Sequence, residues 1–164
     1  MKITFIQTGG SIDKIYPRVL NSYGFDFGEP AFARILKTVD PNFDYQAISL
    51  FKKDSLDITQ ADRELLKQTC LKKSCDKIII THGTDAMVKT AEFLSDIKGK
   101  VIILLGTIRP ECIKDTDADF NLGVAVGAIN VLNEGVYIAM SGRVYRWNEC
   151  EKAPNCKFVE KKRK

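Results

Sequence analysis

The stretch Thr81-His82-Gly83-Thr84-Asp85 decides the fold predicted for this chain. It follows residues 78–80, three isoleucines in a row, and such a short, β-branched and uncharged run is typical of a strand buried on both faces. Residues 86–94 come next and carry apolar side chains at helical spacing. The stretch is therefore a polar loop at the carboxyl end of a buried strand, where open α/β sheets bind ligands. A simpler interpretation, which the residues leave open, is that Thr84 and Asp85 only cap the following helix.

Other apolar runs repeat this pattern of a strand followed by a helix. Strands are expected at residues 3–7, 45–51, 78–81, 101–105 and 136–140, with helices beginning near Pro30, Thr59, Ala86 and Asn121. Strands that alternate with helices predict βαβ units and therefore a parallel sheet. The expected fold class is α/β: a single Rossmann/flavodoxin-like domain with a mainly parallel five-stranded sheet and helices on both faces.

Two of these helices carry more detailed signals. Thr59 is expected to be the N-cap of its helix, and Asp62, three residues on, completes an approximate capping box. In the last helix, Gly123 and Gly127 are expected to allow a close approach to the sheet.

The net charge of +4 lies at the end of the chain. Residues 157–164 contain five lysines and arginines against Glu160, so the remaining residues sum to zero. A basic end on a neutral body is typical of a solvated tail rather than of a nucleic-acid-binding surface. We therefore expect one α/β domain over residues 1–156, a basic disordered tail over residues 157–164, and no nucleic-acid partner.

Composition argues against several classes of protein. No apolar run approaches the roughly 20 residues that span a bilayer, and the first residues are too few for a signal peptide, so neither a membrane partner nor secretion is expected. The five cysteines are odd in number and lack Cys-x-x-Cys spacing, which predicts free thiols in a reducing cytoplasm. A single histidine, His82, rules out a histidine-rich metal site, and we expect it to be a structural loop residue. No metal or cofactor is expected.

Polar loops follow the first two strands as well. Residues 8–12 contain Gly9-Gly10, a pair that permits a tight turn and a close approach to a ligand, and residues 52–57 follow the second strand. Neither matches a dinucleotide fingerprint or a P-loop, so a nucleotide-binding flavodoxin-like domain is only a remote alternative. Because parallel strands end at one edge of a sheet, these loops and residues 81–85 are expected to form one pocket. The aromatic-rich segment 13–28 is either a lid over that pocket or a hairpin.

These loops resemble the signatures of the bacterial-type L-asparaginases, the asparaginase/glutaminase family. Thr8-Gly9-Gly10-Ser11-Ile12 is similar to their Thr-Gly-Gly-Thr-Ile signature, and residues 81–87 resemble His-Gly-Thr-Asp-Thr-Met. The similarity extends to residues 106–110 (family Gly-Ala-Met-Arg-Pro), Asp117 and residues 120–122, and it covers roughly residues 2 to 152. Related amidotransferase subunits share both signatures.

The resemblance implies catalytic roles for a small set of residues. Ser11 occupies the position of the first catalytic threonine and retains its hydroxyl nucleophile. Thr84 matches the second catalytic threonine. Asp85 matches the aspartate that orients the substrate and completes a Thr-Lys-Asp set, whose lysine falls on Lys152. Tyr23 matches the mobile-loop tyrosine that supports the nucleophile. For Lys152 a solvated tail lysine is the alternative.

The same resemblance implies where a substrate binds. Ser55 matches the serine that holds the substrate α-carboxylate, although the next family residue, often glutamine, is Leu56 here. Gly10 and Gly83 lie beside the two hydroxyls, and their backbone N–H groups are available to the substrate and to the developing oxyanion. Asp85 completes the expected binding set.

The expected function is that of an amidohydrolase converting L-asparagine to L-aspartate and ammonia through a covalent acyl-enzyme. By this resemblance the chain corresponds to the N-terminal catalytic-signature domain alone, because asparaginases have a second, C-terminal domain of comparable size. Homodimerisation is expected to help close the site, and the expected compartment is the cytoplasm. The alternative is a non-catalytic amino-acid-binding or sensing module that keeps the pocket without turnover.

Overall fold

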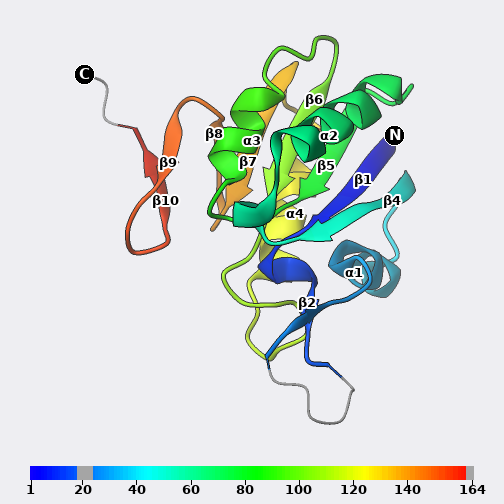
Figure 1. Ribbon diagram of the computed structural model, residues 1–164. Coiled ribbons are helices and arrows are strands. Elements are labelled where there is room, and N and C mark those ends of the chain that lie inside the picture. Colours follow the sequence, from blue (N-terminus) through cyan, green and yellow to red (C-terminus); the bar gives the residue numbers. More distant parts are fainter. Residues whose placement is uncertain (18–23, 162–164) are drawn as a thin grey trace.

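A six-stranded sheet forms the centre of the protein, which a computed structural model describes over residues 1–17 and 24–161 (Figure 1). The strand order is β4-β1-β5-β6-β7-β8, and all neighbours are parallel except β7 and β8. The strands are β1 (Lys2–Gly9), β4 (Asp44–Lys53), β5 (Lys77–Thr81), β6 (Val101–Leu105), β7 (Gly135–Met140) and β8 (Arg143–Arg146). All five strands expected from the sequence are present, and the α/β class is confirmed. The sixth, β8, is short and ends in arginines, so it lacks the apolar run that marks the others.

Four helices cover the two faces of this sheet. They are α1 (Ala31–Val39), α2 (Gln60–Lys72), α3 (Met87–Phe93) and α4 (Ala118–Ile129). Helices α1 and α4 bury residues such as Phe32 and Leu122 against one face, where Phe5 also lies. Helices α2 and α3 bury Leu66 and Met87 against the other face. Because both faces of the sheet are buried at its centre, strands β5 and β6 are almost continuously apolar.

Helices α2 and α4 confirm one detailed prediction and contradict another. Thr59 accepts a hydrogen bond from the backbone N–H of Asp62, whose carboxylate accepts one from the N–H of Thr59, so the capping box is complete. The expected role of Gly123 and Gly127 is wrong. A Cβ placed on either glycine would meet no atom within 4 Å, so both face open space rather than the sheet.

The segment between Asp13 and Gly28 begins and ends as a hairpin. Strand β2 (Lys14–Ile15) pairs antiparallel with β3 (Asp26–Phe27), and the N–H of Gly28 donates to the carbonyl of Asp13 at 2.8 Å. The hairpin alternative therefore holds for the base of this segment. Residues 18–23, including Tyr23, lie outside the described residues.

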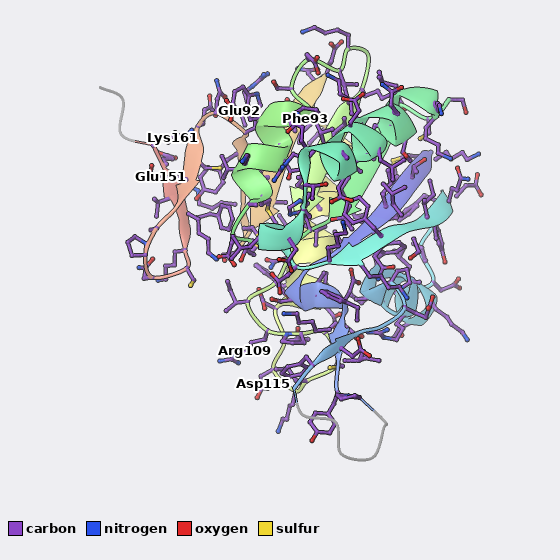
Figure 2. The ribbon with its side chains drawn as sticks, in the orientation of Figure 1. Glu92, Phe93, Arg109, Asp115, Glu151 and Lys161 are labelled. Carbon is purple, nitrogen blue, oxygen red and sulfur yellow. The ribbon has the colours of Figure 1, made fainter. Side chains whose placement is uncertain are left out.

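A second hairpin follows β8 and lies beside α3. It consists of β9 (Cys150–Lys152) and β10 (Phe158–Glu160). Figure 2 labels Glu151 on β9, Lys161 directly after β10, and Glu92 on the neighbouring helix α3. Phe158 and Cys150 are buried in the core on the α2–α3 face. The disorder expected for residues 157–164 is therefore wrong for Phe158–Glu160, because burial of Phe158 anchors this strand; residues 162–164 are not described.

Among the described residues, no helix is both long enough and apolar enough to cross a membrane.

Candidate active site

The turn that carries Ser11 follows the end of β1. Gly9 and Gly10 have φ angles of 103° and 84°, values that side-chain-bearing residues rarely adopt. Ser11 then begins a short 3-10 helix, Ser11–Asp13, and is half-buried. The N–H of Gly10 donates to the carbonyl of Lys53 at the end of β4, at 3.0 Å. The glycine pair thus turns the chain sharply while keeping it against the neighbouring strand.

The loops after β1, β4 and β5 are in direct contact. A Cβ on Gly10 would lie 2.3 Å from the backbone nitrogen of Gly83, so only glycine fits between these two loops. A Cβ on Gly83 would lie 2.7 Å from the Cβ of Ser55. Ser11 and Thr84 directly follow the two touching glycines. The three polar loops therefore meet at one edge of the sheet, as expected from the sequence.

Thr84, Asp85 and Lys152 form a hydrogen-bonded cluster at this edge. The ammonium Nζ of Lys152, on β9, donates to Thr84 Oγ1 at 2.8 Å and to Asp85 Oδ1 at 2.5 Å. The lysine side chain is 18% exposed, whereas Asp85 is 50% exposed and opens the cluster to solvent. Lys152 is therefore not a solvated tail lysine. A hydroxyl, an amine and a carboxylate in contact can pass a proton without a histidine.

The interpretation of Thr84 and Asp85 as helix caps is wrong. Helix α3 begins at Met87, its N-cap is Ala86, and no side chain caps it. Thr84 and Asp85 instead direct their side chains to Lys152. Their presence in the loop is thus not explained by the needs of the helix.

Ser55 packs against the loop after β5 and holds it by a hydrogen bond. It is buried, with 1% of its surface exposed, and its Oγ accepts a hydrogen bond from the N–H of Ala86 at 3.3 Å. It begins a second 3-10 helix, Ser55–Asp57, which Asp54 caps by accepting from the Ser55 N–H. Asp54 also forms an ion pair with Lys14 at 2.7 Å, which ties this loop to the one carrying Ser11. The role of Ser55 in binding a carboxylate stays a prediction.

His82 is fully buried and remains neutral. Its Nδ1 lies 2.7 Å from the carbonyl oxygen of Gly83 and must donate to it, which fixes the tautomer. Burial lowers the pKa of His82 to about 4. Its Nε2 has no hydrogen-bond partner within the described part of the chain. These contacts fit the structural role that we expected for His82.

The loop after β6 is held closely against His82. A Cβ on Gly106 would lie 2.4 Å from the carbonyl oxygen of His82. Asp117 accepts hydrogen bonds from the N–H groups of Ile108 and Arg109, and Arg109 also donates to the carbonyl of Asp115 at 3.0 Å; Figure 2 labels the last two residues. The segment similar to Gly-Ala-Met-Arg-Pro is therefore a scaffold for the loop that contains Thr84.

Asp13 is a buried carboxylate that the sequence analysis did not single out. Its Oδ1 accepts from the N–H of Ala31 at the start of α1, at 2.8 Å, and its Oδ2 accepts from the hydroxyl of Thr81 at 3.3 Å. Burial raises its pKa from 3.8 to about 6, and the hydrogen bonds from Ala31, Gln7 and Thr81 only partly offset the rise. The available signal was an acidic residue two positions after Ser11, in an otherwise uncharged turn.

No group of three or more histidine, cysteine, aspartate or glutamate side chains is placed to hold a metal ion within residues 1–17 and 24–161.

Comparison with known proteins finds a family match over almost the whole chain. Residues 2–158 match the family description "Asparaginase, N-terminal". A glutaminase-asparaginase from Acinetobacter glutaminasificans is 27% identical over 169 residues, which cover 93% of this chain and 50% of that protein. A probable periplasmic L-asparaginase from Haemophilus influenzae is 42% identical over 77 residues, or 44% of this chain and 22% of that protein.

The fold has a counterpart among solved structures. The thermostable L-asparaginase from Thermococcus kodakarensis superposes with a TM-score of 0.82 and 22% identity, covering 98% of this chain and 51% of that one. At 22% sequence identity, this structural similarity shows that the two proteins share a fold. The chain spans about half the length of the glutaminase-asparaginase and of the solved asparaginase that it matches over most of its own length.

Proposed function

We propose that this chain, which belongs to the asparaginase family through its match to the family's N-terminal domain, hydrolyses the side-chain amide of L-asparagine to L-aspartate and ammonia. The contact of Lys152 with both Thr84 and Asp85 carries the proposal. It joins a loop after β5 to a strand more than sixty residues later in the chain, and it leaves a hydroxyl, an amine and a carboxylate at the carboxyl edge of the sheet.

Ser11 and the cluster around Lys152 would divide the chemistry between them. The Ser11 oxygen attacks the amide carbon, the C–N bond breaks, and ammonia leaves with the proton that it needs, forming an ester with Ser11. Water then attacks the ester, Ser11 recovers its proton, and aspartate is released. Thr84 and Lys152 move the proton in each half, and Asp85 fixes the position of the ammonium. The N–H groups of Gly10 and Gly83 are the candidate donors to the oxyanion.

L-Glutamine is a second candidate substrate beside L-asparagine. L-Glutamine differs by one methylene, and a relative carries both substrates in its name. Ser55 is the candidate partner of the α-carboxylate, and Asp85, half exposed, is the candidate partner of the α-amino group. For the compartment we propose the cytoplasm, because all five cysteines are free thiols.

The test is ammonia release by the purified chain with L-asparagine, L-glutamine and D-asparagine. The variants are Ser11→Ala, Thr84→Ala and Lys152→Met, and Lys157→Met is the control, since it removes an exposed lysine from the same hairpin. We expect each of the first three to lower kcat at least about 100-fold, the scale of lost proton-transfer catalysis, and the control to be unchanged. Intact mass after acid quenching should show an aspartyl ester in the wild type and none in Ser11→Ala.

Two results would point elsewhere. Turnover that persists in both Ser11→Ala and Thr84→Ala would contradict the assigned chemistry. Absence of turnover in the wild type, with L-aspartate or L-asparagine still raising the melting temperature, would instead favour the amino-acid-binding or sensing module, because a ligand that binds only the native state raises its stability.

A further inference from the structure

Asp13 is a buried carboxylate that the chemistry proposed above does not use. It is 0% exposed and ends the short 3-10 helix that Ser11 begins. It forms no ion pair with any residue in the ranges 1–17 and 24–161. A carboxylate that is buried without a cation depends on its hydrogen bonds, so the groups that donate to it indicate what it does.

The backbone of Asp13 belongs to the turn that carries Ser11. The N–H of Asp13 donates to the carbonyl of Gly10 at 3.2 Å, which closes the turn around Ser11. The next N–H, of Lys14, donates to the carbonyl of Ser11. The carbonyl of Asp13 accepts from the N–H of Gly28 at 2.8 Å, at the base of the β2–β3 hairpin. A displacement of Asp13 would therefore displace Ser11.

The carboxylate of Asp13 joins this turn to two other elements. Its Oδ1 accepts from the N–H of Ala31 at the start of α1, at 2.8 Å. Its Oδ2 accepts from the hydroxyl of Thr81, the last residue of β5, at 3.3 Å. Thr81 lies three residues before Thr84. The side chain of Asp13 thus connects the loop that carries Ser11 with the loop that carries Thr84.

Thr81 is bonded to residues on both sides of Ser11. Its carbonyl oxygen accepts from the hydroxyl of Thr8 at 2.7 Å, and its own hydroxyl donates to Asp13. Thr8 precedes Ser11 and Asp13 follows it, while β1 and β5 lie side by side in the sheet (Figure 1). These two bonds prevent the two loops from separating. The contact of the glycines that precede Ser11 and Thr84 prevents them from coming closer.

We propose that Asp13, acting through Thr81, is a positioning residue that sets the distance from the Ser11 oxygen to Thr84 and Lys152, an inference that rests on the proposed function. Asp13 is not a catalytic residue, because a side chain with no exposed surface does not reach a substrate at the open edge of the sheet. Attack on an amide carbon requires the reacting atoms to be about 3 to 3.5 Å apart, and a misplacement of about 1 Å can cost about 100-fold in rate.

The first experiment compares the kinetics of ammonia release by Asp13→Ala, Asp13→Asn, Thr81→Val and the double variant Asp13→Ala/Thr81→Val. Asp13→Ala and Thr81→Val should each lower kcat about tenfold or more and leave KM within about twofold, because the lost alignment matters in the transition state. Asp13→Asn keeps the links to Ala31 and Thr81 and should retain kcat. The double variant should be no slower than Asp13→Ala, because both changes break the same link.

A control separates this link from a general loss of hydrogen bonding. Tyr137→Phe also removes one hydroxyl, which donates to the carbonyl of Asn133 at 3.0 Å just before β7 begins, at the opposite edge of the sheet. It should leave kcat unchanged. Melting curves check that each variant is folded at the assay temperature. Thr81→Val keeps the carboxylate and its bond to Ala31, so it tests the link even if Asp13→Ala does not fold.

The second experiment reads the position of Ser11 without amide turnover. p-Nitrophenyl acetate transfers its acetyl group to a reactive hydroxyl and releases p-nitrophenolate, and peptide mass mapping measures the rate at Ser11. Acetylation should slow in Asp13→Ala and Thr81→Val but not in Asp13→Asn. This pattern in a wild type that releases no ammonia would contradict the proposed function and support the positioning role.

Four results would overturn the proposal. They are an unchanged kcat and acetylation rate in Asp13→Ala, a rise in KM alone, an Asp13→Asn variant as slow as Asp13→Ala, and no acetylation of Ser11 in the wild type.

Discussion

Replacing Asp13 by asparagine should stabilise the protein at neutral pH, and the gain should disappear in acid. Asp13 is buried under the turn that carries Ser11, with the N–H of Ala31 and the hydroxyl of Thr81 as partners. The asparagine Oδ1 can still accept from Ala31, and its Nδ2 can donate to the Thr81 oxygen. The substitution therefore removes a buried charge and keeps the hydrogen bonds with Ala31 and Thr81, and it gives up the bond that the carboxylate accepts from the Gln7 side chain.

The size and sign of the effect follow from the pKa of Asp13. Burial raises it from 3.8 to about 6, which corresponds to about 3 kcal/mol. Because the folded state binds the proton more tightly, ionised Asp13 lowers stability. This loss is absent below pH 3.8, grows as the pH rises, and is complete above about 6. Asp13→Asn should thus equal the wild type near pH 4 and exceed it by up to about 3 kcal/mol at pH 8.

Urea unfolding at a series of pH values measures this difference directly. Taking wild type and variant at each pH cancels the contribution of His82, whose pKa of about 4 lies in the same window. Asp96→Asn is the control: Asp96 is exposed beside Lys67, which lowers the pKa of its carboxyl, so removing its charge should give no gain at neutral pH. A difference that does not change with pH, or a wild type that is the more stable protein at pH 8, would refute the reasoning.

Three further outcomes are expected. Gly10→Ala should lower the free energy of unfolding by about 3 kcal/mol or more in urea titrations, because the new Cβ would lie 2.3 Å from the Gly83 nitrogen at a φ of 84°. Gly123→Ala is the control: this residue lies within α4 and faces open space, so the substitution should be neutral or stabilising. A chromogenic thiol reagent should modify the exposed Cys112 and Cys156 quickly and reach Cys70 only on unfolding, since burial raises the pKa of that thiol to about 12. Thr59→Ala removes the hydroxyl that accepts from the Asp62 N–H, while the backbone N–H of residue 59 can still donate to the Asp62 carboxylate, and it should cost about 1 kcal/mol, read as a lower melting temperature.

The central strands could be predicted because burial on both faces requires an uninterrupted run of apolar residues, which is visible in the sequence. The runs that became β5 and β6 are apolar throughout, and their glycine-bearing loops marked the edge where the site lies. The two signatures also indicated which side chains to consider. What the sequence could not distinguish was whether Lys152 is part of the site, because the position of β9 depends on packing of Cys150 and Phe158 rather than on any local pattern.

The errors have physical causes of the same kind. A basic segment was expected to be solvated, yet one buried aromatic, Phe158, is enough to order β10. Gly123 and Gly127 suggested close packing, but α4 turns them away from the sheet. Asp13 was overlooked because its partners, Ala31 and Thr81, come from elements far away in sequence.

The place of Lys152 on the β9–β10 hairpin has a consequence for the order of events during synthesis. The ribosome delivers Ser11, Ser55 and Thr84 long before it delivers the lysine, and Phe158, which seats the hairpin against the core, follows later still. A nascent chain can therefore assemble its sheet and bring the three glycine and serine loops together while its amine is still missing. The cluster of Thr84, Asp85 and Lys152 is completed only after translation has passed residue 158, so the β9–β10 hairpin brings the amine to loops that are already in place.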